Sequence, residues 1–183
     1  MYDAKLFADL ITVTRGALGA VMIWFGLTQN REALSVVIPL MILCWTGDFV
    51  DGGLAHRSRN PRHTWIGDHD VNMDAFVSIC LGIYLIGAGY VVLATGVVYL
   101  LFWTVVFMRV GNDRNLLMLA QAPIYLAFLL IALQFDPARG YLIVAWVATA
   151  TALNWRRFSK DTVPAFLARM KSLRDDHSKP RHS

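Results

Sequence analysis

Six long apolar runs follow one another along this chain, and only short polar segments separate them. A helix needs about 20 mostly apolar residues to cross the hydrocarbon core of a bilayer. The runs span Leu10–Thr28, Leu34–Leu54, Trp65–Ile86, Val91–Met108, Leu116–Gln134 and Tyr141–Trp155. Of the 183 residues, 56% are hydrophobic and 16% are charged, which is too little charge for the surface of a soluble domain and too apolar for a disordered chain. We therefore expect an all-α integral membrane protein with six transmembrane helices.

Basic residues gather on one side of these six runs. The termini and the connections on their side hold 15 of the 17 Lys and Arg residues, while Arg31 and Arg139 lie on the other side. The positive-inside bias therefore predicts that both termini lie in the cytoplasm. We expect a transmembrane domain over residues 1–155, beginning with an N-terminal interfacial segment. A basic cytoplasmic tail would follow over residues 156–183, with an interfacial amphipathic helix over Val163–Leu173.

Four aspartates occupy the facing ends of the second and third runs. Asp48 and Asp51 lie near the end of the second run, and Asp70 and Asp74 lie near the start of the third. Residues three or four apart share one face of a helix, and the short connection makes the two helices antiparallel neighbours. The four carboxylates are thus expected to converge just inside the cytoplasmic surface, where ionisable groups are costly and mark functional sites. The neighbouring Asp68 falls on another part of the helix surface.

Such a cluster of like charges needs a positive partner, because repulsion is stronger at low dielectric. Carboxylate oxygens are hard ligands that suit Mg²⁺, Mn²⁺ or Ca²⁺, so a divalent-cation site is the favoured interpretation. A structural network with Arg57, Arg59 and Arg62 is a second interpretation, and a proton or cation pathway is a third. The network is less favoured because only one sign of charge lies inside the predicted spans.

The aspartates also carry a family resemblance. The segment Asp48-Phe-Val-Asp51-Gly52-Gly-Leu-Ala55-His56, followed by Gly67 and by Asp70-Val-Asn-Met-Asp74, resembles the signature of the CDP-alcohol phosphatidyltransferase family. That signature reads D-x-x-D-G-x-x-A-R and then G-x-x-x-D-x-x-x-D. The stretch Asp9-Leu-Ile-Thr12-Val-Thr-Arg15 is similar to the family's N-x-x-T-x-x-R entry to its first span. The layout is closest to phosphatidylglycerophosphate synthase-like members, although His56 stands where the family has Arg and Gly67 lies one residue closer to Asp70.

The resemblance implies a reaction and a role for each matched residue. A phosphatidyl group would move from a CDP-alcohol lipid, usually CDP-diacylglycerol, to the hydroxyl of a small acceptor, and CMP would leave. Asp74 would act as general base in a site that holds Mg²⁺ or Mn²⁺, with two ions expected. The metal ligands would be Asp48, Asp51, Asp70 and Asp74, and the nucleotide would contact Gly52, Ala55, His56, Arg57 and Gly67. Family members are often homodimers.

Two arginines between the fourth and fifth runs suggest where the acceptor binds. Arg109 and Arg114 lie on the predicted side of the aspartates. They would either anchor the protein by the positive-inside bias or bind a phosphorylated acceptor, because Arg recognises phosphate well. Glycerol 3-phosphate is the first candidate, followed by an inositol phosphate and by serine. We expect no nucleic-acid partner, since no fold signature of that class is present.

Two functions of other classes remain open from the sequence. One is a metal-binding or transport protein on the same scaffold, without transferase activity. The other is an inactive subunit that only binds a partner protein.

Overall fold

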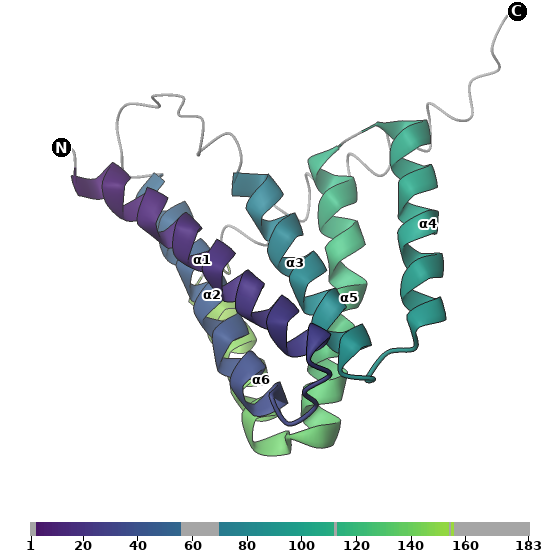
Figure 1. Ribbon diagram of the computed structural model, residues 1–183. Helices are drawn as coiled ribbons and strands as arrows, with labels where there is room; N and C mark the ends of the chain where they lie inside the picture. The colour runs from purple at the N-terminus through teal and green to yellow at the C-terminus, as the bar shows by residue number, and fades with distance from the viewer. Residues whose placement is uncertain (1–2, 56–69, 112, 154, 156–183) are drawn as a thin grey trace, which may run out of the picture. The chain divides into compact units, whose positions relative to one another are not determined.

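The computed structural model describes residues 3–55, 70–111, 113–153 and 155, and these are all-helical, as predicted (Figure 1). Six helices follow one another: α1 (Asp3–Leu27), α2 (Leu34–Ala55), α3 (Asp70–Gly87), α4 (Leu93–Val110), α5 (Arg114–Phe135) and α6 (Pro137–Leu153). Each helix overlaps one of the six apolar runs. The part of the third run before Asp70 lies outside the described residues.

Within the described part of the chain, three helices are long and apolar enough to cross a bilayer, over Leu10–Leu27, Leu93–Val110 and Asn115–Phe135. Leu34–Phe49 and Met73–Gly87 are shorter apolar helical stretches. The α4 helix contains no buried residue, and side chains such as Leu101, Phe102 and Met108 are exposed along it. A continuous apolar surface of this kind suits contact with lipid. The protein is thus compatible with a membrane, while the count of six spans and their orientation stay predictions.

The start of the last helix differs from the sequence prediction. We predicted a connection over Phe135–Gly140, but α5 ends at Phe135 and α6 already begins at Pro137. Proline suits the first position of a helix because its missing N–H would have no intrahelical partner there. Asp136 caps the helix, since its Oδ1 accepts the backbone N–H of Arg139 at 3.3 Å. The Arg139 guanidinium bonds the same carboxylate at 2.6 Å and lowers the pKa of Asp136.

The N-terminal segment also takes a simpler form than expected. Residues from Asp3 onward belong to α1 itself, so the segment is helical and continuous with the first apolar run. A place for its first turns at the membrane interface stays a prediction.

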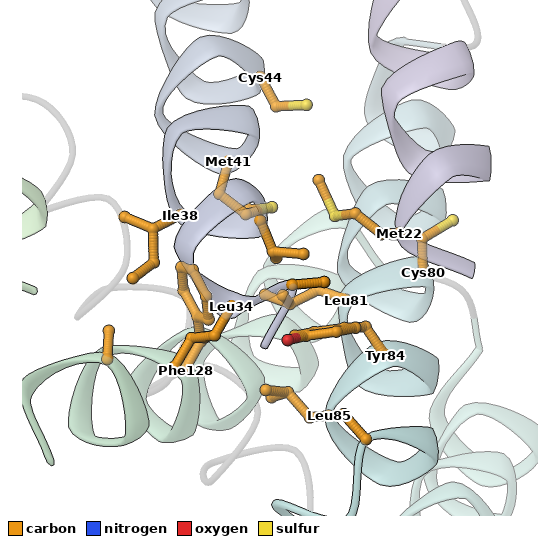
Figure 2. Close-up of a cluster of buried hydrophobic side chains, with 14 of the residues drawn as sticks. Met22, Leu34, Ile38, Met41, Cys44, Cys80, Leu81, Tyr84, Leu85 and Phe128 are labelled. Atoms are coloured by element: carbon orange, nitrogen blue, oxygen red, sulfur yellow. The ribbon is translucent and has the colours of Figure 1, made fainter. Parts of the chain in front are cut away.

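The chain divides into two compact units, Met1–Val144 and Ala145–Ser183. In the second unit the structure describes Ala145–Leu153, the end of α6, and Trp155. The first unit contains the buried hydrophobic core, to which α1, α2, α3, α5 and α6 contribute (Figure 2). Met22, Met41, Tyr84 and Phe128 are its largest fully buried side chains from four of these helices. Within this unit α1 packs against both α2 and α3, and α3 packs against α5.

At the end of the first unit where α1 and α3 end, an arginine lies over two aromatic rings. The Arg31 guanidinium lies 4.8 Å from the ring centre of Tyr90 and 4.9 Å from that of Phe135. The Tyr90 hydroxyl donates to the Arg31 carbonyl at 2.9 Å. These contacts tie the α1–α2 connection to the ends of α3 and α5. The aspartates lie toward the opposite ends of α2 and α3.

The α1 and α3 backbones touch near their C-terminal ends. A Cβ atom built on Gly87 would lie 2.2 Å from the carbonyl oxygen of Gly26 and 2.6 Å from its carbonyl carbon. These are backbone atoms, which cannot move aside as a flexible side chain can. Glycine at position 87 therefore sets how closely the two helices approach.

We expect Gly87→Ala to lower the free energy of unfolding by about 1–3 kcal/mol, the usual range for an overpacked core. The measurement is the midpoint of thermal unfolding of the detergent-solubilised protein, followed by circular dichroism. Gly82→Ala in the same helix is the control, because its Cβ would meet only the Ile124 Cδ1 atom at 4.0 Å. Equal midpoints for the two variants would contradict the backbone contact.

Candidate functional site

An arginine from the first helix joins two of the predicted aspartates. Arg15 lies in α1 and is only 3% exposed. Its Nη1 atom donates to Asp48 Oδ1 of α2 at 3.4 Å, and its Nη2 atom donates to Asp74 Oδ1 of α3. One guanidinium therefore brings together carboxylates from two different helices.

The two carboxylates are more open to the surroundings than the arginine. The Asp48 and Asp74 side chains are 45% and 35% exposed, whereas the Arg15 side chain is 4% exposed. The positive charge of Arg15 is thus buried, and the two negative charges are partly accessible. The accessible atoms of this ion network are therefore the carboxylate oxygens.

Small residues explain how α1 comes close enough for these contacts. A Cβ on Gly47 of α2 would lie 3.0 Å from Ile11 Cγ2 and 3.4 Å from Arg15 Cδ, both on α1. On the other side, Gly16 faces Met73 of α3, with 3.7 Å between its built Cβ and the Met73 Cε atom. The contact at Gly16 would be an ordinary one, whereas the space at Gly47 is tight. The absence of a side chain at Gly47 therefore helps the long Arg15 side chain to fit between α1 and α2 and to reach both aspartates.

This arrangement corrects one argument made from the sequence. We took only negative charge to lie inside the predicted spans, and we counted Arg15 with the cytoplasmic basic residues. The structure instead buries Arg15 within α1, inside the apolar stretch Leu10–Leu27. The signal was present in the sequence as a single arginine in an otherwise apolar window. Our predicted network used Arg57, Arg59 and Arg62, which lie outside the described residues.

The other two aspartates of the predicted set are placed by the backbone alone. Asp51 lies three residues after Asp48 on α2, and Asp70 is the first residue of α3, four before Asp74. Residues at these spacings share a helix face. The structure does not describe the side chains of Asp51 and Asp70. Among the described residues no three His, Cys, Asp or Glu side chains form a metal-ligand group, so the four-carboxylate metal site stays a prediction.

The predicted nucleotide contacts fall at the end of α2 and beyond it. Gly52 and Ala55 belong to the last turns of α2, on the same end of the helix as Asp48. His56, Arg57 and Gly67 lie outside the described residues, as does the tail after Trp155. The nucleotide-binding role therefore stays a prediction.

The predicted acceptor arginines flank two helix ends. Arg109 is exposed in the last turn of α4, which Gly111 ends with a φ of 91°. Asp113 caps α5 by accepting the backbone N–H of Asn115 at 2.8 Å, and Arg114 begins that helix. No ion pair between Arg109 and Asp48 or Asp74 is present in the part of the chain that the structure describes.

A polar pair on α5 was not predicted from the sequence. Gln121 is 8% exposed, and its Oε1 atom accepts a hydrogen bond from the Tyr125 hydroxyl at 3.4 Å. The Tyr125 ring meets Trp45 of α2 edge-on, with 5.5 Å between ring centres. The available signal was an amide and a phenol one turn apart in an apolar helix.

Comparisons with protein-family models, curated proteins and solved structures find no match to this chain. The resemblance to the CDP-alcohol phosphatidyltransferases therefore stays a prediction that rests on the aspartate pattern.

The geometry nonetheless limits what chemistry the site can carry out. Paired carboxylates can hold a divalent cation or accept a proton. A guanidinium at the same point can balance their charge or bind a phosphate oxygen. These capacities suit the transfer of a phosphorus-containing group from an anionic donor.

Proposed function

We propose that this protein is a metal-dependent CDP-alcohol phosphatidyltransferase of the membrane. The observation that carries the proposal is the convergence of Asp48 and Asp74, from two helices, on one buried arginine. Asp51 and Asp70 lie one helical turn from them along the sequence. This arrangement supports the transferase because phosphoryl-type transfer depends mainly on positioning and on charge stabilisation.

The donor set fits a hard divalent cation. Asp48, Asp51, Asp70 and Asp74 would hold Mg²⁺ or Mn²⁺, since carboxylate oxygens are the ligands these ions prefer. The bound metal would neutralise the pyrophosphate and the charge that develops on CMP.

The chain's own residues supply the remaining steps. Asp74 accepts the proton of the acceptor hydroxyl, whose oxygen then attacks the phosphorus atom of the phosphatidyl group. The bond from this phosphorus to the bridging oxygen breaks, and CMP leaves with that oxygen and its electron pair. Arg15 fixes the position of Asp74 through its Nη2 atom, so that the base stays within reach of the acceptor.

The proposed place in the membrane follows from the same site. We propose six spans with both termini in the cytoplasm, which puts the aspartates at the cytoplasmic face. The side chains of Asp48 and Asp74 are partly exposed, which would let substrates reach them. A donor with acyl chains would enter sideways from the bilayer, and a small polar acceptor would enter from the cytoplasm.

A second candidate function has its own support. Arg15 can neutralise Asp48 and Asp74 by itself, which is what a purely structural ion network requires. The protein would then be a membrane scaffold for metal binding, transport or partner binding, without transferase chemistry.

CMP release separates the two functions. Purified protein in detergent, supplied with Mg²⁺ or Mn²⁺, CDP-diacylglycerol and either glycerol 3-phosphate, inositol 1-phosphate or serine, is expected to release CMP with one acceptor above the others. Chelation of the metal should abolish the release. The absence of CMP with every acceptor, for a protein with a cooperative thermal transition, would reject the transferase in favour of the scaffold.

A further inference from the structure

The polar pair on α5 lies at the depth of the aspartates. Gln121 is seven residues from the start of α5, and Asp48 is seven residues from the end of α2. At 1.5 Å per residue, each lies about 10 Å from its helix end. Figure 1 shows the start of α5 and the start of α3 at the same end of the unit, and α3 packs against α5. The ring contact of Tyr125 with Trp45, three residues before Asp48, places the pair near the point where Arg15 joins the carboxylates.

The two polar atoms of the Gln121 amide differ in their surroundings. Among the described residues, the fully buried side-chain polar atoms without a partner are Arg15 Nε and the Tyr84 hydroxyl, so the Gln121 amide nitrogen is not fully buried. The hydrogen bond from Tyr125 uses the oxygen of Gln121, and no described residue accepts from its amide nitrogen in a hydrogen bond that the structure shows. The nitrogen is a donor that a ligand can use.

The apolar core begins directly beyond this pair. Trp45 packs edge-on against both Tyr125 and Phe128, at 5.5 and 6.4 Å between ring centres. Phe128 is completely buried, and it joins the core cluster that contains Met41 and Cys44 (Figure 2). Tyr125 and Gln121 are thus polar groups directly beside the aromatic part of the apolar core.

Tyr125 and Gln121 together form one wall of the proposed site, which we call the α5 wall. Its chemistry differs from that of the other residues of the site. The charged groups come from α1, α2 and α3, whereas the wall offers an amide N–H and a phenol hydroxyl without charge. Phosphate binding favours arginine and charge-assisted hydrogen bonds. An uncharged amide and phenol instead suit the hydroxyl groups of a small alcohol.

We infer that Tyr125 and Gln121 are acceptor-binding residues, which position a small hydroxylated acceptor beside Asp74. The inference rests on the proposed transferase function and adds a substrate contact from a fourth helix. Tyr125 is suited to this position because its ring contacts Trp45, which lies three residues before Asp48 on α2. The acceptor would hydrogen-bond to Tyr125 and Gln121 through its hydroxyls.

Steady-state kinetics test this role. The assay follows CMP release from CDP-diacylglycerol, with whichever of glycerol 3-phosphate, inositol 1-phosphate or serine supports the fastest wild-type turnover. Tyr125→Phe removes only the hydroxyl, and Gln121→Met removes the amide with little change in size. Each variant is expected to raise the acceptor KM about tenfold, the equivalent of one lost hydrogen bond, with kcat within about threefold and the donor KM unchanged.

Tyr99→Phe is the matched control. The Tyr99 hydroxyl of α4 donates to the Ala120 carbonyl of α5, so this change removes a structural hydroxyl next to the wall. It should leave the acceptor KM unchanged, and thermal unfolding should show that all three variants fold. An unchanged acceptor KM in Tyr125→Phe and Gln121→Met, or an equal rise in the donor KM, would overturn the inference while wild-type CMP release keeps the transferase. A wild-type protein that releases no CMP would overturn both.

Discussion

The Asp74→Asn variant should release CMP at least about a hundredfold more slowly than the wild-type protein, without losing its fold. A positioned general base contributes about 10²–10⁴-fold to such a reaction. Asparagine has nearly the shape of aspartate, but it does not accept the proton of the acceptor hydroxyl. Its amide oxygen can still accept the hydrogen bond from Arg15 Nη2, so the link between α1 and α3 should persist. The measurement is the initial rate of CMP release together with the midpoint of thermal unfolding.

Asp136→Asn is the matched control for this substitution. Asp136 caps α6 and pairs with Arg139, on helix ends that do not carry the predicted aspartates. The same chemical change should leave CMP release unaltered there. Turnover in Asp74→Asn within about threefold of wild type would remove the general-base role from Asp74.

The sequence predicted the helices well because membrane helices are recognisable from local composition. An apolar run of the right length must satisfy its own backbone hydrogen bonds, so it must be helical. The ends are less determined, because they depend on single capping residues. The run ending at Trp155 was assigned a start at Tyr141, yet Asp136 and Pro137 together begin α6 earlier. The sequence contains both the capping residue and the proline, but the apolar run alone predicts a loop at these positions.

The site was predicted only in part, because it depends on contacts between helices. The spacing of Asp48 from Asp51 and of Asp70 from Asp74 marks two helix faces without any tertiary information. Nothing local reveals that Arg15, 33 residues before Asp48, fills the space between those faces. Its role depends on glycines at the helix crossing, such as Gly47, which admit the side chain.

The pair of Gln121 and Tyr125 on α5 likewise depends on contacts between helices that the sequence does not reveal. Gln121 is separated from Asp74 by more than 40 residues, and no periodic pattern connects them. A single amide side chain in an apolar helix indicates a polar contact in the folded state, because buried polar groups are usually hydrogen-bonded. That partner, Tyr125, lies one turn further along the same helix, but its ring contact with Trp45 of α2 is known only from the folded structure.

The Arg15→Gln variant should lose stability without metal and regain it with metal. Removing one member of a fully buried ion pair costs about 3–5 kcal/mol, and an exposed pair contributes about 0–1 kcal/mol. Arg15 is buried while its partners are partly exposed, so we expect a loss of about 2–3 kcal/mol. For a chain of this size that corresponds to a fall of about 4–12 °C in Tm.

The response of the Arg15→Gln variant to a divalent cation distinguishes a metal site at Asp48 and Asp74 from a structural ion network. If Asp48 and Asp74 belong to a metal site, Mn²⁺ can supply the lost positive charge, and at 100 times its Kd it adds about 2.7 kcal/mol. We therefore expect Mn²⁺ to restore most of the Tm of Arg15→Gln, as measured by thermal unfolding in detergent. Arg139→Gln, which breaks an exposed pair with Asp136, should show neither the loss nor the recovery. Destabilisation of Arg15→Gln that Mn²⁺ does not relieve would instead mean that Arg15 and its aspartates form a structural network, because such a network requires a guanidinium rather than a cation of any kind.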